Sequence, residues 1–302
     1  MKKFLLTACA AIALMGPNIA VAQTAAATPV VATTDADPAL WVVKDDDTTI
    51  YLFGTVHVLK PGLSWFDEGV KKAFDSSDQL VLELVQPDQA AMQALVMKVA
   101  VNPDGPTLTE KLPDDLKPKY AAAMTEVGVP TAAFDRMDPW FAGLTLSLLP
   151  LMKLGYDPNA GAEMVLTEAA KAAGKPVSGV ETAEQQMGFF DALSEPAQIG
   201  FLASTIDSLP RVGPVLDSMV AAWAKGDPDA LNGIMNEELR ETPEVAKALL
   251  SDRNARWADW IDTRLDTPGT VFMAVGAGHL AGSDSVQAWL GKRDLDATRV
   301  NY

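Results

Sequence analysis

Tyr51-Leu52-Phe53-Gly54-Thr55-Val56-His57 and Val271-Phe272-Met273-Ala274-Val275-Gly276-Ala277-Gly278-His279 are built in the same way. Each stretch begins with an apolar run that predicts a buried strand, and each ends in a Gly-x-x-His sequence. These stretches contain the only two histidines of the 302 residues. Imidazole is well suited to proton transfer near neutral pH and is the commonest metal ligand among side chains. We therefore predict that His57 and His279 both act in the function of the protein, each at the end of a strand.

A third apolar run contains a carboxylate. Leu80-Val81-Leu82-Glu83-Leu84-Val85 is continuously apolar apart from Glu83, and such runs are typical of central strands covered on both faces. In open α/β sheets, sites form beyond the carboxyl ends of the strands. Because a buried carboxylate is costly unless it is paired, we predict that Glu83 points at the same site as the two histidines. The alternative is a strand-end carboxylate that reaches water or a salt bridge.

Arg253 is the next candidate. A helix predicted over about 243–265, with Thr242 as its N-cap, places Arg253 on its apolar face. An arginine on a buried face requires an anion. Two interpretations stay open: a structural salt bridge, for instance with Glu83, or a clamp for an oxyanion or a substrate carboxylate. Other polar residues are interpreted as helix caps, namely Ser64, Asp157 or Asn159, and Glu181.

Two histidines and one carboxylate form the ligand set of many catalytic metal sites. The three residues are far apart in the sequence, so their spacing is not diagnostic, and no His-Glu-x-x-His helix is present. The same residues also suit a metal-free site, in which one histidine is a general base, Glu83 orients it and the other histidine polarises the substrate. A non-enzymatic binder of haem or metal is a third hypothesis. No Gly-x-Ser-x-Gly elbow, Walker loop or Gly-x-Gly-x-x-Gly motif supports a serine hydrolase or a nucleotide-binding protein.

The first residues are typical of an export signal. Lys2 and Lys3, the apolar run 4–15 and the small-x-small sequence before Gln23 predict cleavage after Ala22, and the run is too short to span a bilayer. The only cysteine is Cys9, so we expect no disulfide in the mature chain. The net charge of −16 argues against nucleic acid as a partner. We predict a periplasmic or secreted protein, without a stable transmembrane segment, that acts on a peptide or a small molecule.

The pattern of elements predicts an α/β fold. Residues 1–22 form the signal peptide, 23–38 a flexible leader and 39–302 a single domain with a mostly helical insertion over about 88–265. The apolar segment 140–154 contains Pro150 and is short, so we interpret it as a buried core helix. Helices are also expected at 64–76, 182–193 and 283–291, and strands at 40–43, 49–53, 79–85, 175–180, 270–276 and 297–301. Together these elements predict a mixed central sheet with a large helical middle region.

Several separated motifs, taken in order, resemble the TraB/GumN family, which includes the Tiki metalloproteases. The similar stretches are Leu40-Trp41-Val42-Val43, the two Gly-x-x-His segments, Glu83, Lys175-Pro176-Val177 leading to Glu181-Thr182-Ala183-Glu184-Gln185, and Arg253-Asn254-Ala255-Arg256-Trp257. The resemblance implies a core like that of erythromycin-esterase-like and ChaN-like proteins. It also implies that His57, Glu83 and His279 form the site, with Arg253 and Asn254 in support, and that the cofactor is a divalent metal such as manganese, cobalt or zinc. The leading hypothesis is an exported metal-dependent hydrolase, with peptidase activity favoured.

Overall fold

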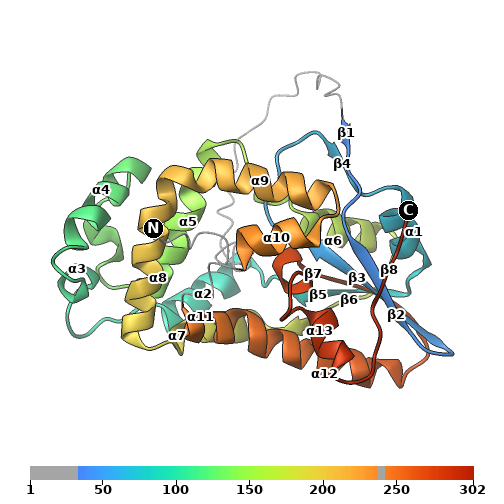
Figure 1. Cartoon of the computed structure of the whole chain (residues 1–302). Coiled ribbons are helices and arrows are strands. Elements are labelled where there is room, and N and C mark those ends of the chain that lie inside the picture. Colours follow the sequence, from blue (N-terminus) through green and yellow to red (C-terminus); the bar gives the residue numbers. More distant parts are fainter. Residues whose placement is uncertain (1–32, 237–241) are drawn as a thin grey trace.

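A six-stranded mixed sheet forms one half of the computed structural model, on the right in Figure 1; the model describes residues 33–236 and 242–302. The strand order is β6-β5-β7-β3-β2-β8. Four neighbouring strands are parallel: β6 (Val177–Glu181), β5 (Gln79–Leu84), β7 (Gly269–Gly276) and β3 (Thr48–Thr55). β2 (Leu40–Lys44) is antiparallel to β3, and β8 (Thr298–Arg299) is antiparallel to β2. Because the four parallel strands share one direction, their carboxyl ends lie along one edge of the sheet.

The predicted mixed sheet and its first two strands, expected at 40–43 and 49–53, are confirmed. β2 and β3 pair in antiparallel register around the polar turn that contains Asp45 and Asp47. The folded part begins before residue 39. Strand β1 (Thr34–Asp35), which falls inside the segment expected to be a flexible leader, pairs with β4 (Leu63–Ser64). The signal-peptide prediction and residues 23–32 of the leader lie outside the described residues.

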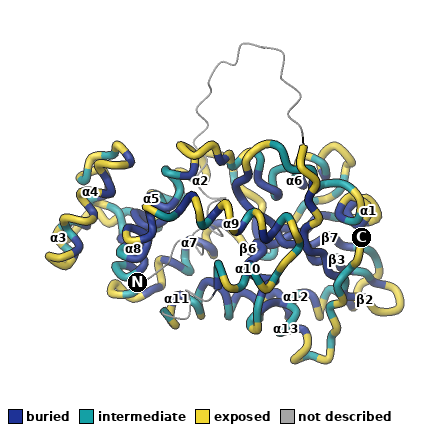
Figure 2. Tube along the Cα trace, turned by 45° about the horizontal axis from the view of Figure 1, so that its top comes forward, coloured by how far each residue is buried: buried dark blue, intermediate teal, exposed yellow. Residues whose placement is uncertain are grey.

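Helices cover both faces of the sheet, which explains the continuous apolar runs of its central strands (Figures 1 and 2). On one face, side chains such as Phe53 and Phe272 pack against α1 (Glu68–Ser76), α6 (Ala162–Ala172) and α9 (Val212–Ala224). On the other face, Met273 and its neighbours pack against α12 (Asp252–Leu265) and α13 (Val286–Gly291). Parts of the predicted helical middle region therefore belong to the layers of the sheet.

Most of the remaining helices of the middle region form a second apolar core beside the sheet (Figure 1). The segment predicted as a buried core helix is α5 (Pro139–Lys153), and the first half of this helix is largely buried. Within residues 33–236 and 242–302, no helix is both long and apolar enough to cross a membrane. The other helical elements of this region are α2 (Gln89–Val99), α3 (Leu108–Lys111), α4 (Lys117–Val127), η2 (Thr131–Phe134), η3 (Pro158–Ala160), α7 (Ala183–Asp191), α8 (Glu195–Ser208), η4 (Leu209–Arg211), α10 (Pro228–Met235) and α11 (Pro243–Ala246).

Two predicted helices differ in detail from the structure. The helix expected over 64–76 begins at Glu68 with Asp67 at the N-cap position, and the Ser64 hydroxyl donates to the Asp67 carboxylate, so Ser64 is not the cap. The helix expected over 243–265 consists of α11, a π-helical segment η6 (Lys247–Ser251) and α12. Thr242 is at the predicted N-cap position. The π-helical turn changes the register of the helix immediately before Arg253.

Candidate functional site

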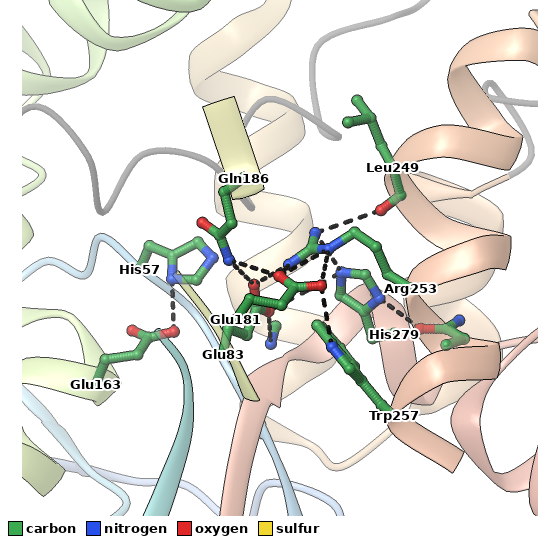
Figure 3. A network of polar contacts seen from close by, with 12 residues as sticks. His57, Glu83, Glu163, Glu181, Gln186, Leu249, Arg253, Trp257 and His279 are labelled. Atoms are coloured by element: carbon green, nitrogen blue, oxygen red, sulfur yellow. Dashed lines mark hydrogen bonds and ion pairs between the residues drawn. The ribbon is translucent and has the colours of Figure 1, made fainter. Parts of the chain in front are cut away.

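The carboxyl ends of the four parallel strands bring the predicted residues together (Figure 3). Glu83 lies in β5, Glu181 ends β6, His57 follows β3 by two residues, and His279 lies in η7 (Ala277–Leu280), directly after β7. All four side chains are buried. A Cβ atom built on Gly276 would lie 3.0 Å from Glu83 Oε1, 3.6 Å from His57 Nε2 and 3.6 Å from the His279 ring. The three residues predicted from the sequence therefore meet around Gly276, where an added Cβ would crowd the Glu83 carboxylate and touch both histidine rings.

The guanidinium of Arg253 lies between the carboxylates (Figure 3). Its Nη2 donates to Glu83 Oε2 at 2.6 Å and to Glu181 Oε2 at 2.7 Å, and its Nε lies 3.0 Å from Glu181 Oε1. Its Nη1 lies 3.2 Å from His279 Nε2 and donates to the Leu249 carbonyl at 3.4 Å. All five N–H groups of the guanidinium are thus directed at protein acceptors. Of the two interpretations of Arg253, the structural salt bridge agrees with these contacts.

Burial lowers the pKa of Arg253, but Glu83 and Glu181 outweigh this effect and raise the pKa above its usual value, so the guanidinium stays charged. A charged group removed from water requires charged partners to offset the lost hydration. Arg253 and the two carboxylates consequently form one buried ionic cluster that depends on all of its members.

Glu181 is part of this cluster, and its interpretation as the cap of helix α7 is wrong. Thr182 is the N-cap instead, and with Gln185 it forms a capping box. Glu181 is the one buried residue of the edge strand β6, and its side chain accepts from Arg253 and from Trp257 Nε1 at 3.1 Å. The sequence interpretation missed this role because a glutamate directly before a helix also suits a cap.

His279 is held in one tautomer by Asn254. Asn254 Nδ2 donates to the Asp284 carbonyl at 2.7 Å, which turns Asn254 Oδ1 toward His279 Nδ1 at 2.6 Å. Nδ1 must therefore carry the proton, and the Nε2 lone pair accepts from Arg253. Burial, followed by the charge of Arg253, holds the pKa of His279 well below its usual value. His279 is thus a neutral ring that orients the arginine.

We expect this tautomer to be visible by NMR. In long-range ¹H–¹⁵N spectra recorded at neutral pH, His279 should have a protonated Nδ1 and an unprotonated Nε2, because burial and the charge of Arg253 hold its pKa well below the usual value. The Asn254→Leu variant removes the acceptor of the Nδ1 proton and should shift the tautomer equilibrium. A ring that takes up a proton near its ordinary pKa, or that carries its proton on Nε2, would contradict this assignment.

His57 has a different carboxylate partner from the one expected. Its Nδ1 lies 2.5 Å from Oε1 of Glu163, in the first turn of α6, whereas Glu83 is occupied by Arg253 and by the Gly276 N–H at 2.6 Å. Burial lowers the pKa of His57, but Glu163, helped by Glu83, outweighs this effect, so the pKa lies above 6.5. His57 Nε2 is buried and has no hydrogen-bond partner among the described residues. A histidine oriented by a carboxylate at one nitrogen is arranged as a general base at the other.

Glu163 reaches His57 because α6 begins against the first Gly-x-x-His turn. The N–H of Ala162 donates to the carbonyl of Val56 at 3.0 Å. A Cβ atom on Gly161 would lie 2.1 Å from the His57 carbonyl oxygen, so only glycine permits this approach. Asp157 accepts from the N–H of Asn159 and caps η3, as predicted. This local geometry places the first turn of α6 beside His57.

The arrangement does not fit a bound metal at His57, Glu83 and His279. Within the two described ranges, no three His, Cys, Asp or Glu side chains are grouped to hold a metal ion. Glu83 accepts from Gly276 and Arg253, and the lone pair of His279 Nε2 faces Arg253. The arginine thus contributes a positive charge next to two of the three proposed ligands, and a cation would have to displace it.

The fold and the site define an α/β protein with a buried histidine–glutamate–arginine cluster at the carboxyl ends of its parallel strands. The chain belongs to the TraB/PrgY/gumN family, whose model matches residues 39–299. It is similar to the uncharacterized protein YbaP of Escherichia coli (strain K12), with 23% identity over 253 residues that cover 84% of this chain and 92% of YbaP. An uncharacterized protein of Treponema pallidum (strain Nichols) is 21% identical over 277 residues, which cover 84% of this chain and 80% of that protein. No solved structure matches the chain. The predicted family is therefore confirmed.

Proposed function

We propose that this chain is a hydrolase in which His57, oriented by Glu163, removes a proton from the attacking water. The observation that carries this proposal is the 2.5 Å contact between His57 Nδ1 and Glu163, together with a buried Nε2 that has no partner among the described residues. A carboxylate at Nδ1 favours the tautomer whose Nε2 accepts a proton, and it stabilises the imidazolium that forms. In this metal-free mechanism, Glu163 orients His57, a role predicted for Glu83 from the sequence.

The reaction has two steps at an amide or ester carbonyl. In the first step, His57 Nε2 takes a proton from water while the water oxygen bonds to the carbonyl carbon and the π electrons move to the carbonyl oxygen. In the second step, the carbonyl re-forms, the bond to the leaving nitrogen or oxygen breaks, and His57 returns the proton to the leaving group. Arg253 keeps Glu83 and His279 in position. For Arg253 to act as an oxyanion clamp, a substrate oxygen must replace one of its present acceptors.

The pH dependence of hydrolysis should follow His57. Only the neutral ring accepts a proton, so activity should rise with pH, with its midpoint above 6.5. In Glu163→Gln the midpoint should move to lower pH, because the carboxylate that raises the pKa of His57 is gone. The stability linked to protonation of His57 has the opposite dependence: it is present below about pH 6.5 and is lost as the pH rises through the higher folded-state pKa. A pH–rate profile whose midpoint does not change in Glu163→Gln would contradict the proposal.

A metal-dependent hydrolase, which the family resemblance implies, is the second proposal. The Nε2 of His57, which has no partner in the described part of the chain, favours it, since neutral imidazole is a common ligand. His57, Glu83 and His279 would hold the metal after Arg253 had moved away, and the metal would lower the pKa of its bound water. The contacts of Arg253 with Glu83 and His279 oppose this arrangement.

Metal content separates the two proposals. In protein purified without a histidine tag, we expect far less than one equivalent of manganese, cobalt or zinc by mass spectrometry, and hydrolysis that persists after chelation. His57→Ala and His279→Ala provide the comparison. A near-stoichiometric metal that is lost in both variants would overturn the metal-free mechanism and establish the second proposal.

Three further parts of the proposal concern the location, the fold family and the substrate. We propose export to the periplasm or beyond, with a mature chain beginning at Gln23, which N-terminal sequencing of the native protein would test. We also propose a core like that of erythromycin-esterase-like and ChaN-like proteins, and a peptide as the favoured substrate. Haem binding receives less support, because both ring nitrogens of His279 already have protein partners.

A further inference from the structure

Gln186 has a buried carbonyl oxygen for which the mechanism above provides no role. The side chain is only 3% exposed. Its Nε2 donates to Glu83 Oε2 at 3.2 Å and to Glu181 Oε2 at 3.0 Å, which uses both of its hydrogens. A flipped amide would turn Oε1 toward two carboxylates, so the orientation of the side chain is determined by its neighbours. Oε1 is buried and has no partner among the described residues.

His57 Nε2 is a second buried acceptor of the same kind at this site. Both side chains lie beside the Glu83 carboxylate: Gln186 Nε2 donates to Glu83 Oε2, and His57 Nε2 and Glu83 Oε1 lie 3.6 and 3.0 Å from a Cβ position on Gly276. In Figure 3 the second nitrogen of the His57 ring is turned toward the side-chain amide of Gln186. The two side chains come from different elements, Gln186 from α7 and His57 from the turn after β3. Buried polar atoms almost always have a partner in the protein or in ordered water. A single partner with two donors, such as water, would satisfy both acceptors.

We propose that Gln186 Oε1 and His57 Nε2 together bind the water that attacks the substrate. The water donates one hydrogen to each acceptor, so one of its lone pairs is left for the carbonyl carbon. As His57 removes one hydrogen, the other stays on Gln186, which neither gains nor loses a proton. Gln186 therefore contacts the reacting water and sets the direction of its lone pair. This inference rests on the proposed hydrolase, but the water position can be observed without any substrate.

The experiment compares two variants that separate the acceptor of Gln186 from its donors. Gln186→Met keeps the length of the side chain and removes both. Gln186→Glu keeps the acceptor, and beside two other carboxylates it should take up a proton and so retain one donor. Gln198→Met is the matched control, because Gln198 is also buried, its Nε2 donates to two carbonyls, and it lies on α8, outside the site.

In high-resolution crystal structures we expect a water within hydrogen-bonding distance of both Gln186 Oε1 and His57 Nε2 in the wild type and in Gln198→Met. In Gln186→Met this water should be lost. For hydrolysis of a 4-nitrophenyl ester or fluorescent casein, Gln186→Met should lower kcat by roughly tenfold with little change in KM, and Gln186→Glu should retain most of the activity. A purely structural role would instead affect kcat, KM and thermal stability together.

The outcomes distinguish this inference from the proposed function. A wild-type structure with no water bridging the two atoms, a substrate N–H bound to Gln186 Oε1 in its place, or a Gln186→Met variant with the water and kcat unchanged overturns the inference. If His57→Gln abolishes hydrolysis while Gln186→Met does not reduce it, only the inference fails. If His57→Gln hydrolyses these probes like the wild type, the proposed function fails as well.

Discussion

His57→Gln is expected to lower the rate constant of hydrolysis by about 100-fold or more. Glutamine is similar in size and remains polar, but it cannot accept a proton from water. Glu163→Gln should also reduce the rate strongly, because it removes the charge that lies 2.5 Å from His57 Nδ1 and stabilises the imidazolium. The measurement is the initial rate of cleavage of fluorescent casein and of a 4-nitrophenyl ester at several pH values.

Glu168→Gln is the matched control for Glu163→Gln. Glu168 lies on the same helix, but its side chain is 67% exposed, and its ion-pair partner among the described residues is Lys171, at 3.8 Å. This variant should hydrolyse the probes at the wild-type rate. Circular dichroism should show that all three variants are folded. Wild-type rates in both His57→Gln and Glu163→Gln would mean that this pair is not the general base.

Arg253→Met is expected to lower the free energy of unfolding by about 3–5 kcal/mol. The substitution leaves the carboxylates of Glu83 and Glu181 buried without their cation, and it removes the donor that faces His279 Nε2. Methionine fills part of the same volume, so the loss should come mainly from electrostatics. Urea denaturation followed by circular dichroism measures the effect.

Arg256→Met is the control, because Arg256 also contacts Glu181, but at 3.8 Å and with a side chain that is 49% exposed. Exposed pairs typically contribute at most about 1 kcal/mol, so this variant should be nearly as stable as the wild type. The triple variant Glu83→Gln, Glu181→Gln, Arg253→Met should recover part of the stability lost in Arg253→Met, because no unpaired charge remains buried. If Arg253→Met is no less stable than Arg256→Met, the cluster does not have the structural role described above.

The sequence by itself determined most strands of the central sheet and indicated that three candidate site residues lie at or near strand ends. Apolar runs before His57 and His279 and around Glu83 predicted buried strands, because local patterning records which strands are covered on both faces. The structure adds that these strands are parallel neighbours, so that their carboxyl ends meet at one edge and bring the three residues together. The apolar stripe of the helix likewise indicated that Arg253 is buried and requires an anion.

Only the tertiary structure decided which side chains are partners. Glu163 contacts His57 because α6 packs against a turn more than 100 residues earlier in the chain, and this approach depends on the absence of a side chain at Gly161. Glu181 and Gln186 are also site residues because of how distant elements pack. A glutamate between a strand and a helix equally suits a helix cap, so the local sequence does not show that Glu181 is buried against Arg253. Periodicity specifies which face of an element is buried, whereas the contacts between polar atoms depend on how distant elements pack.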